Sequence, residues 1–115
     1  YRVQGRDAEA AERLRTEASR LEDAGCFSIV LELVPAVLAG EISRSLQVPT
    51  IGIGAGAETD GQVLVLHDML GLNETFRPRF VRRFGELGPA ARSAISDYVA
   101  AVRAGQFPTA EHSFE

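Results

Sequence analysis

The sequence predicts an α/β fold built on parallel strands, and two features carry that prediction. Short apolar runs alternate along the chain with segments whose apolar residues recur every three or four positions. The first pattern is typical of buried strands and the second of helices. The apolar runs hold few polar residues, which is typical of strands covered on both faces in a parallel sheet. Strands that are separated by helices pair in parallel through right-handed crossovers.

The first half of the chain carries the clearest signals. We expect a helix over residues 7–23, with Asp7 as its N-cap, an apolar stripe through Leu14, and Gly25 just beyond its end. Residues 26–34 then form a near-continuous apolar run, which predicts a strand buried on both faces.

A second helix and two more strands are expected next. Pro35 fits the first position of a helix that runs to residue 47. A second buried strand is expected over residues 50–56, and a polar loop then leads to a third strand over residues 63–67.

Two further helices are predicted from apolar spacing. The residues that mark the first are Phe76, Phe80, Val81, Phe84 and Leu87, and those that mark the second are Ala91, Ile95, Val99 and Val102. Gly105 closes the second helix, and an irregular tail follows from Phe107.

Composition bounds the class of protein. With 115 residues, 45% hydrophobic and 24% charged, the chain suits one globular domain with a core. Its net charge of −4 argues against nucleic acid or an anionic membrane as a partner, because both need a basic face. The one basic cluster is interpreted as a solvated helix face; it consists of Arg77, Arg79, Arg82 and Arg83.

A cytoplasmic location is expected. Cys26 is the lone cysteine, which rules out an internal disulfide and a cysteine zinc site. No apolar run approaches the roughly 18–20 residues that span a bilayer. The first five residues lack the basic and apolar regions of a signal peptide.

The predicted strands favour part of a barrel. Three parallel strands buried on both faces leave two open sheet edges, which a closed barrel removes. A (β/α)8 barrel needs about 250 residues. We therefore expect residues 1–115 to be a single segment that forms the C-terminal half of a (β/α)8 barrel. An open α/β sandwich is the competing architecture.

Glu32 is the first candidate for a catalytic residue. It is a lone carboxylate near the C-terminal end of an apolar strand, and burial of an unpaired charge there is costly. Parallel α/β folds place their active sites at the C-terminal ends of strands. The alternative is a structural acid that caps a neighbouring loop.

The glycines at the end of the second strand have two possible uses. Gly52, Gly54 and Gly56 form a G-x-G-x-G pattern, and no apolar helix follows them, so a dinucleotide site is disfavoured. They allow either close approach of a ligand to the backbone or tight packing.

Other polar residues give weaker signals. His67 and Asp68 close the third predicted strand, and His67 is either a general base or ligand, or one member of a local hydrogen-bonded pair with Asp68. Asp60 is expected to serve the turn between two glycines. His112 lies in the polar tail, and neither histidine has partners at metal-ligand spacing.

Several strings in order resemble the ketopantoate hydroxymethyltransferase family. They are Tyr1-Arg2-Val3-Gln4-Gly5-Arg6, Val30-Leu31-Glu32-Leu33-Val34-Pro35, Ile51-Gly52-Ile53-Gly54-Ala55-Gly56 with Thr59-Asp60-Gly61-Gln62-Val63-Leu64-Val65, His67-Asp68, and Phe107-Pro108 with Glu111-His112-Ser113-Phe114. Each string alone is weak, but five in order are specific, and together they cover essentially the whole chain.

The resemblance implies an activity and a base. It implies that a hydroxymethyl group passes from 5,10-methylenetetrahydrofolate to 3-methyl-2-oxobutanoate, giving 2-dehydropantoate in pantothenate biosynthesis. It implies Glu32 as the base that removes the C3 proton, with Mg²⁺ holding the keto acid. The family's metal and keto-acid ligands lie on earlier strands, so no metal ligand is assigned here and this segment alone is expected to be inactive. A homo-oligomer is also implied, with a last helix over residues 89–104 that packs on a neighbouring subunit.

Two alternatives remain at this stage. One is another barrel that acts on α-keto acids through a magnesium enolate, of the phosphoenolpyruvate mutase and isocitrate lyase kind. The other is a non-catalytic half-barrel that assembles with a complementary N-terminal half.

Overall fold

A computed structural model describes residues 3–114 of the chain. Tyr1 and Arg2, which open the first of the strings above, and Glu115 lie outside the described residues. Contacts divide the chain into two compact units, one up to Leu64 and one from Val65 onward.

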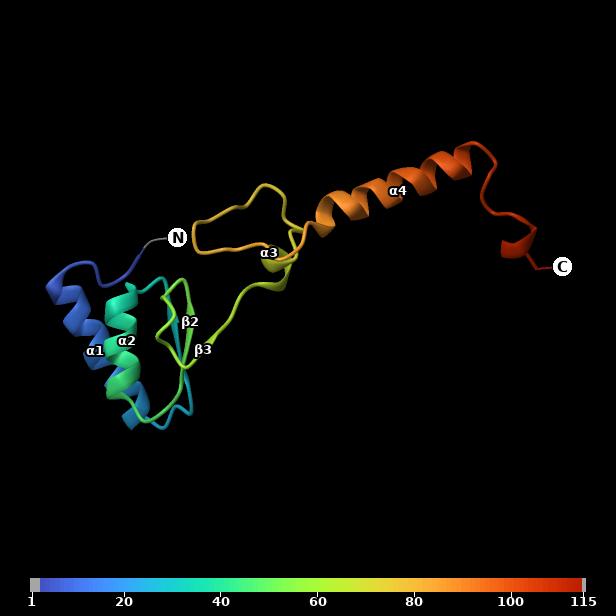
Figure 1. Ribbon diagram of the computed structural model, residues 1–115. Helices are drawn as coiled ribbons and strands as arrows, with labels where there is room; N and C mark the ends of the chain where they lie inside the picture. The colour runs from blue at the N-terminus through green and yellow to red at the C-terminus, as the bar shows by residue number, and fades with distance from the viewer. Residues whose placement is uncertain (1–2, 115) are drawn as a thin grey trace. The chain divides into compact units, whose positions relative to one another are not determined.

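The first unit is an α/β unit of two layers, in which two helices cover one face of a small parallel sheet (Figure 1). Its elements are α1 (Ala8–Asp23), β1 (Ile29–Glu32), α2 (Ala36–Ser45), β2 (Thr50–Ile53) and β3 (Gly61–Gln62). Both strand pairs are parallel and the order is β1-β2-β3, so the predicted parallel pairing is confirmed.

Helix α1 matches its prediction. The Asp7 carboxylate accepts a hydrogen bond from the Ala10 amide at 2.8 Å, as an N-cap does. Gly25 adopts φ +88° just beyond the helix, in the left-handed region that glycine enters without steric cost. Helix α2 also lies where expected, with Pro35 as its N-cap rather than its first residue.

The core of this unit lies between the sheet and the two helices. It consists of Ala18, Ile29, Leu31, Val34, Leu38, Ala39, Ile42, Leu46 and Ala55. In β1, Ile29 and Leu31 are buried, whereas Val30 is 60% exposed and Glu32 is exposed. The prediction that this strand is buried on both faces is therefore wrong for the described residues, because α1 and α2 cover one face only.

The third predicted strand is misplaced. Strand β3 is Gly61–Gln62, and one further hydrogen bond joins the Val63 amide to the Gly52 carbonyl at 3.0 Å. The segment expected to be a strand over residues 63–67 instead leads into a short helix, α3 (Leu66–Met69). Val63 and Val65 are about half exposed. Beyond Val63 no residue of this run pairs with β2 in the described part of the chain.

The second unit holds α3, α4 (Leu87–Arg103) and a 3-10 turn, η1 (Ala110–His112). The predicted helix through Phe76, Phe80 and Phe84 is wrong, because that segment is irregular. Pro78 lies near its start, where it has no amide to donate and disfavours a helical conformation of Arg77. The second predicted helix is confirmed as α4, which contains no buried residue.

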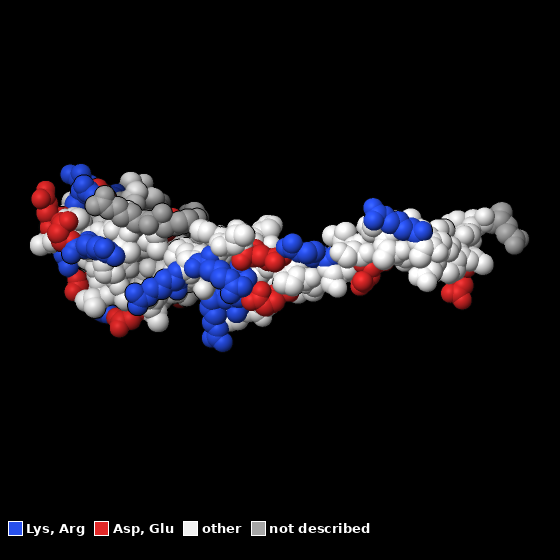
Figure 2. Space-filling view, turned by 90° about the horizontal axis from the view of Figure 1, so that it is seen from above, with Lys and Arg blue, Asp and Glu red and all other residues white. Residues whose placement is uncertain are grey.

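Arg83 holds the irregular segment together. Its guanidinium donates to the carbonyl oxygens of Asn73 and Phe76 and pairs with Glu86 at 3.1 Å. Its side chain is 9% exposed, whereas Arg77, Arg79 and Arg82 are exposed. The basic cluster is therefore not a solvated helix face, and acidic side chains lie among the basic ones on the face in Figure 2.

None of the helices in the described part of the chain is both long and apolar enough to cross a membrane.

Candidate active site

The carboxyl ends of β1 and β2 meet at one edge of the sheet. Glu32, the last residue of β1, is in register with Ile53, the last residue of β2. Gly54 follows directly, so Glu32 and Gly54 share this edge as predicted. Active sites of parallel α/β folds form at this edge, because the loops that follow the strands converge there.

Glu32 points to the uncovered face of the sheet. The strand buries Ile29 and Leu31 against the helices, so the alternation of side chains turns Val30 and Glu32 the other way. Among residues 3–114 the Glu32 carboxylate makes no hydrogen bond or ion pair. The described residues thus provide no cation or hydrogen-bond donor for this carboxylate, and it is open to a ligand on that face.

The backbone after Glu32 is unusual. Leu33 has φ +53°, the only positive φ of a residue other than glycine among those the structure describes. The Leu33 amide donates to the Ile53 carbonyl, and the Leu33 carbonyl accepts from the Gln4 amide, each at 2.9 Å. No local sequence pattern indicates this conformation, because tertiary hydrogen bonds hold it.

The glycines of the second strand serve packing. A Cβ atom at Gly52 would lie 2.6 Å from the Thr59 hydroxyl oxygen, and one at Gly56 would collide with Ala36. Gly56 also has φ +81° and Gly54 has φ +64°. Of the two uses left open above, tight packing is the one that the contacts of Gly52 and Gly56 support.

Asp60 lies at the other end of β2, where it holds the strand's first residue. Its carboxylate accepts from the Thr50 amide at 2.8 Å and from the Thr50 hydroxyl at 3.0 Å. These hydrogen bonds lower the pKa of Asp60 from its ordinary value. Asp60 was predicted to serve the turn, and it also links the β2–β3 loop to β2 through these hydrogen bonds.

His67 and Asp68 do not close a strand. Both lie in α3, in the second unit, and the expectation that His67 ends a third strand beside Glu32 and Gly54 is wrong. His67 is exposed, Asp68 is buried, and no hydrogen bond joins the two side chains.

His112 has a structural position. Its Nδ1 atom lies 2.7 Å from the Thr109 hydroxyl in a capping box at η1. Its ring lies 5.1 Å from that of Phe107, which in turn meets Tyr98 edge to face at 5.6 Å. These contacts fasten the tail after α4.

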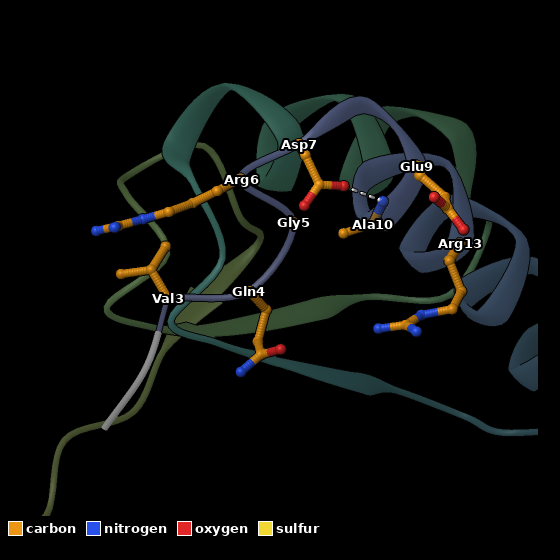
Figure 3. Close-up of a pocket in the computed structure, with 8 residues that line it drawn as sticks. All are labelled: Val3, Gln4, Gly5, Arg6, Asp7, Glu9, Ala10 and Arg13. Carbon is orange, nitrogen blue, oxygen red and sulfur yellow. Dashed lines mark hydrogen bonds between the residues drawn. The ribbon is translucent and has the colours of Figure 1, made fainter.

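A hollow of about 680 Å³ in the first unit lies beside the segment that leads into α1 (Figure 3). It is lined by Val3, Gln4, Gly5, Arg6, Asp7, Glu9, Ala10 and Arg13. Two basic and two acidic side chains share it, and no strand residue reaches it. The hollow therefore does not contain Glu32, and its mixed charge favours no particular ligand.

Metal ligands are not grouped in the described residues. Between Val3 and Phe114 no three histidine, cysteine, aspartate or glutamate side chains come together in a way that could hold an ion.

The geometry defines a class of protein before a family: an α/β fragment with a free carboxylate at the carboxyl edge of a parallel sheet. Comparison with known sequences gives the family. The ketopantoate hydroxymethyltransferase family matches residues 1–110. The chain belongs to this family.

Relatives with the name 3-methyl-2-oxobutanoate hydroxymethyltransferase match almost the whole chain. The protein of Roseiflexus sp. is 60% identical over 112 residues, which are 97% of this chain and 40% of the relative. The protein of Chlorobaculum parvum is 54% identical over 114 residues, which are 99% of this chain and 41% of the relative. The chain thus spans about two fifths of the length of these curated relatives.

Proposed function

We propose that this chain is part of an enzyme that transfers a hydroxymethyl group from 5,10-methylenetetrahydrofolate to 3-methyl-2-oxobutanoate. Family membership supports the reaction, and the names of the relatives state the acceptor and the group transferred. The observation on this chain that carries the proposal is Glu32, a carboxylate without a partner among the described residues, on the open face at the carboxyl edge of the sheet.

Glu32 is proposed as the general base. Its carboxylate takes the proton from C3 of the keto acid, and the electron pair of the broken C–H bond passes into the enolate. A positioned base of this kind typically contributes about 10²- to 10⁴-fold to the rate.

The remaining atoms balance as follows. C3 forms a bond to the one-carbon unit, whose bonds to the two folate nitrogens break. Water supplies the oxygen of the new hydroxyl group. One folate nitrogen receives the proton that Glu32 removed, and the other receives a proton from water. The products are 2-dehydropantoate and tetrahydrofolate.

Magnesium is proposed as the cofactor, with ligands outside this chain. When bound to the keto acid, Mg²⁺ withdraws charge from the developing enolate. The described residues bring no cluster of metal ligands together, so they do not fit such a site on their own and no step of this chain depends on it.

The architecture is proposed as the C-terminal half of a (β/α)8 barrel over residues 1–115. Parallel pairing of β1, β2 and β3 and the uncovered sheet face support it, since a closed barrel would cover that face. A cytoplasmic location is proposed from the lone cysteine and from the biosynthetic family.

Transfer of labelled carbon tests the function. The complete enzyme is mixed with the keto acid and with methylenetetrahydrofolate that carries ¹³C in the methylene group. The proposal expects ¹³C in the hydroxymethyl group of 2-dehydropantoate. Conversion of the keto acid without folate would favour an enzyme of the phosphoenolpyruvate mutase kind instead, and no conversion of either substrate would contradict the proposal.

A further inference from the structure

We infer that Leu33 is a positioning residue whose left-handed backbone, held by Ile53 and Gln4, aims the Glu32 carboxylate. This inference rests on the proposed role of Glu32 as the base. It concerns how this chain fixes the direction of a side chain that no other side chain among residues 3–114 restrains.

The direction of Glu32 depends on its backbone. Its carboxylate is exposed and has no hydrogen-bonding or ionic partner within residues 3–114. The orientation of the Cα–Cβ bond therefore decides where the carboxylate can reach. A catalytic group must be held close to its productive geometry, and a displacement of about 1 Å can cost roughly 100-fold in rate.

Leu33 ends the strand immediately after Glu32. In β1, residues alternate between the core and the open face, and a continued strand would turn Val34 to the open face. Val34 is instead 4% exposed and belongs to the core. The φ of +53° at Leu33 produces this reversal, so Glu32 is the last side chain that the strand presents to the open face.

Two hydrogen bonds hold Leu33 in this conformation. Its amide donates to Ile53, which is the register partner of Glu32, and its carbonyl accepts from the Gln4 amide. Leucine rarely adopts this backbone region, so the surrounding structure must impose it. Strained residues of this kind gather at functional sites.

Gly5 holds the segment that supplies the Gln4 amide. It has φ +65°, and a Cβ atom there would lie 2.7 Å from Leu38 and 2.8 Å from Leu14. A side chain here would press on both leucines, and the positive φ strains any residue other than glycine. In Figure 3 the Gln4 side chain points away from α1, toward the strands.

Substitutions that separate backbone from side chain test the inference in the complete enzyme. Leu33→Val keeps an apolar side chain, but a β-branched residue strongly resists positive φ. Leu33→Asn changes the chemistry, but asparagine tolerates it. We measure the exchange of the C3 hydrogen of the keto acid with D2O, the KM for the keto acid and the thermal midpoint.

Leu33→Val is expected to slow exchange about 10- to 100-fold with KM within about threefold, and Leu33→Asn to stay within about threefold of wild type. Exchange at the wild-type rate in folded Leu33→Val would overturn the inference, and so would an equal loss in Leu33→Asn. If Leu33→Val does not fold, the comparison of Gly5→Ala with Gly25→Ala decides instead, and Leu33→Gly, which enters positive φ without steric cost, must stay within about threefold of wild type.

Substitutions at a matched pair of glycines test whether the Gln4 amide helps to hold Leu33. Gly5→Ala should slow exchange, whereas Gly25→Ala should not. Gly25 has a similar positive φ, meets no atom within 4 Å, and precedes the opposite end of β1. Equal exchange rates in the two variants would overturn the role given to Gln4.

Glu32→Gln, run in parallel, separates the two proposals. If it exchanges at the wild-type rate, Glu32 is not the base and the proposed function of this residue fails. If it loses exchange while Leu33→Val does not, only the inference about Leu33 fails.

Discussion

At the scale of single residues, Thr50 shows how hydroxyl groups are arranged at the amino end of the sheet. Thr50 is fully buried, and its hydroxyl lies 3.0 Å from Asp60 and 2.6 Å from the Ser43 hydroxyl, which also lies 2.8 Å from the Ala39 carbonyl. Two hydroxyl protons cannot serve three contacts. The Asp60 carboxylate and the Ala39 carbonyl can only accept, so Thr50 donates to Asp60, Ser43 donates to Ala39, and the contact between the two hydroxyl oxygens has no proton of its own.

This arrangement predicts how stability depends on pH. The pKa of Asp60 is lowered in the folded state from its ordinary value of 3.8, so its stabilising contribution is complete above that value. The contribution is lost as the pH falls through the lower folded-state pKa. The free energy of unfolding of the complete enzyme should exceed that of Asp60→Asn at pH 6, and the difference should narrow below about pH 4.

Denaturant titrations of both proteins across this range check the expectation. A difference that stays constant from pH 6 down to pH 3 would mean that the charge of Asp60 does not matter.

Sequence reasoning reached some of these residues and not others. Glu32 and Asp60 could be picked out because a carboxylate at a strand end or between glycines is a local signal. Leu33 could not, because its φ depends on hydrogen bonds from Ile53 and from Gln4, which is distant in sequence.

At the scale of elements, prediction succeeded where the signals are local. Asp7 and Gly25 bracket α1, and both act as expected. The strand over residues 63–67 failed because an apolar run needs a neighbour to pair with, and the helix near Phe80 failed because Pro78 and the hydrogen bonds of Arg83 favour an irregular course.

A link between elements can be tested at Glu22. Its carboxylate, near the end of α1, accepts from the Gln47 amide at 2.6 Å and from the Val48 amide at 2.9 Å, in the turn between α2 and β2. Glu22→Ala leaves both amides without this acceptor and should lower the free energy of unfolding by about 2 kcal/mol.

Glu17→Ala is the matched control on the same helix. Within residues 3–114, Glu17 makes only an exposed pair with Arg13 at 3.6 Å, so its loss should change stability by less than about 0.5 kcal/mol. Equal effects of the two substitutions in urea titrations would contradict the role given to Glu22.

At the scale of the whole molecule, apolar surface is left uncovered. Helix α4 has no buried residue, and Ile95 and Tyr98 are 64% and 57% exposed. In the first unit, Val30 is 60% exposed on the open sheet face. On α4 the exposed apolar residues Ile95, Tyr98, Val99 and Val102 recur every three or four positions, and exposed apolar surface of this kind marks an interaction site.

Residues 1–115 alone should therefore aggregate, self-associate or bind a complementary N-terminal half. In the complete protein we expect a homo-oligomer in which the helix over residues 89–104 packs on a neighbouring subunit. Sedimentation velocity at low micromolar concentration checks both expectations. A well-behaved monomer of the 115-residue chain would contradict the first, and a monomeric complete enzyme would contradict the second.

The most direct test of the central claim is exchange of the C3 hydrogen of 3-methyl-2-oxobutanoate in D2O, followed by NMR with the complete enzyme and its Glu32→Gln variant. Glutamine keeps the size of the side chain but cannot accept the proton. Exchange should fall about 10²- to 10⁴-fold, equivalent to roughly 3–5.5 kcal/mol of barrier, with little change in affinity for the keto acid. If exchange continues at the wild-type rate while turnover falls, Glu32 acts after enolisation; if both continue, it is a structural acid, and either result contradicts its assignment as the base.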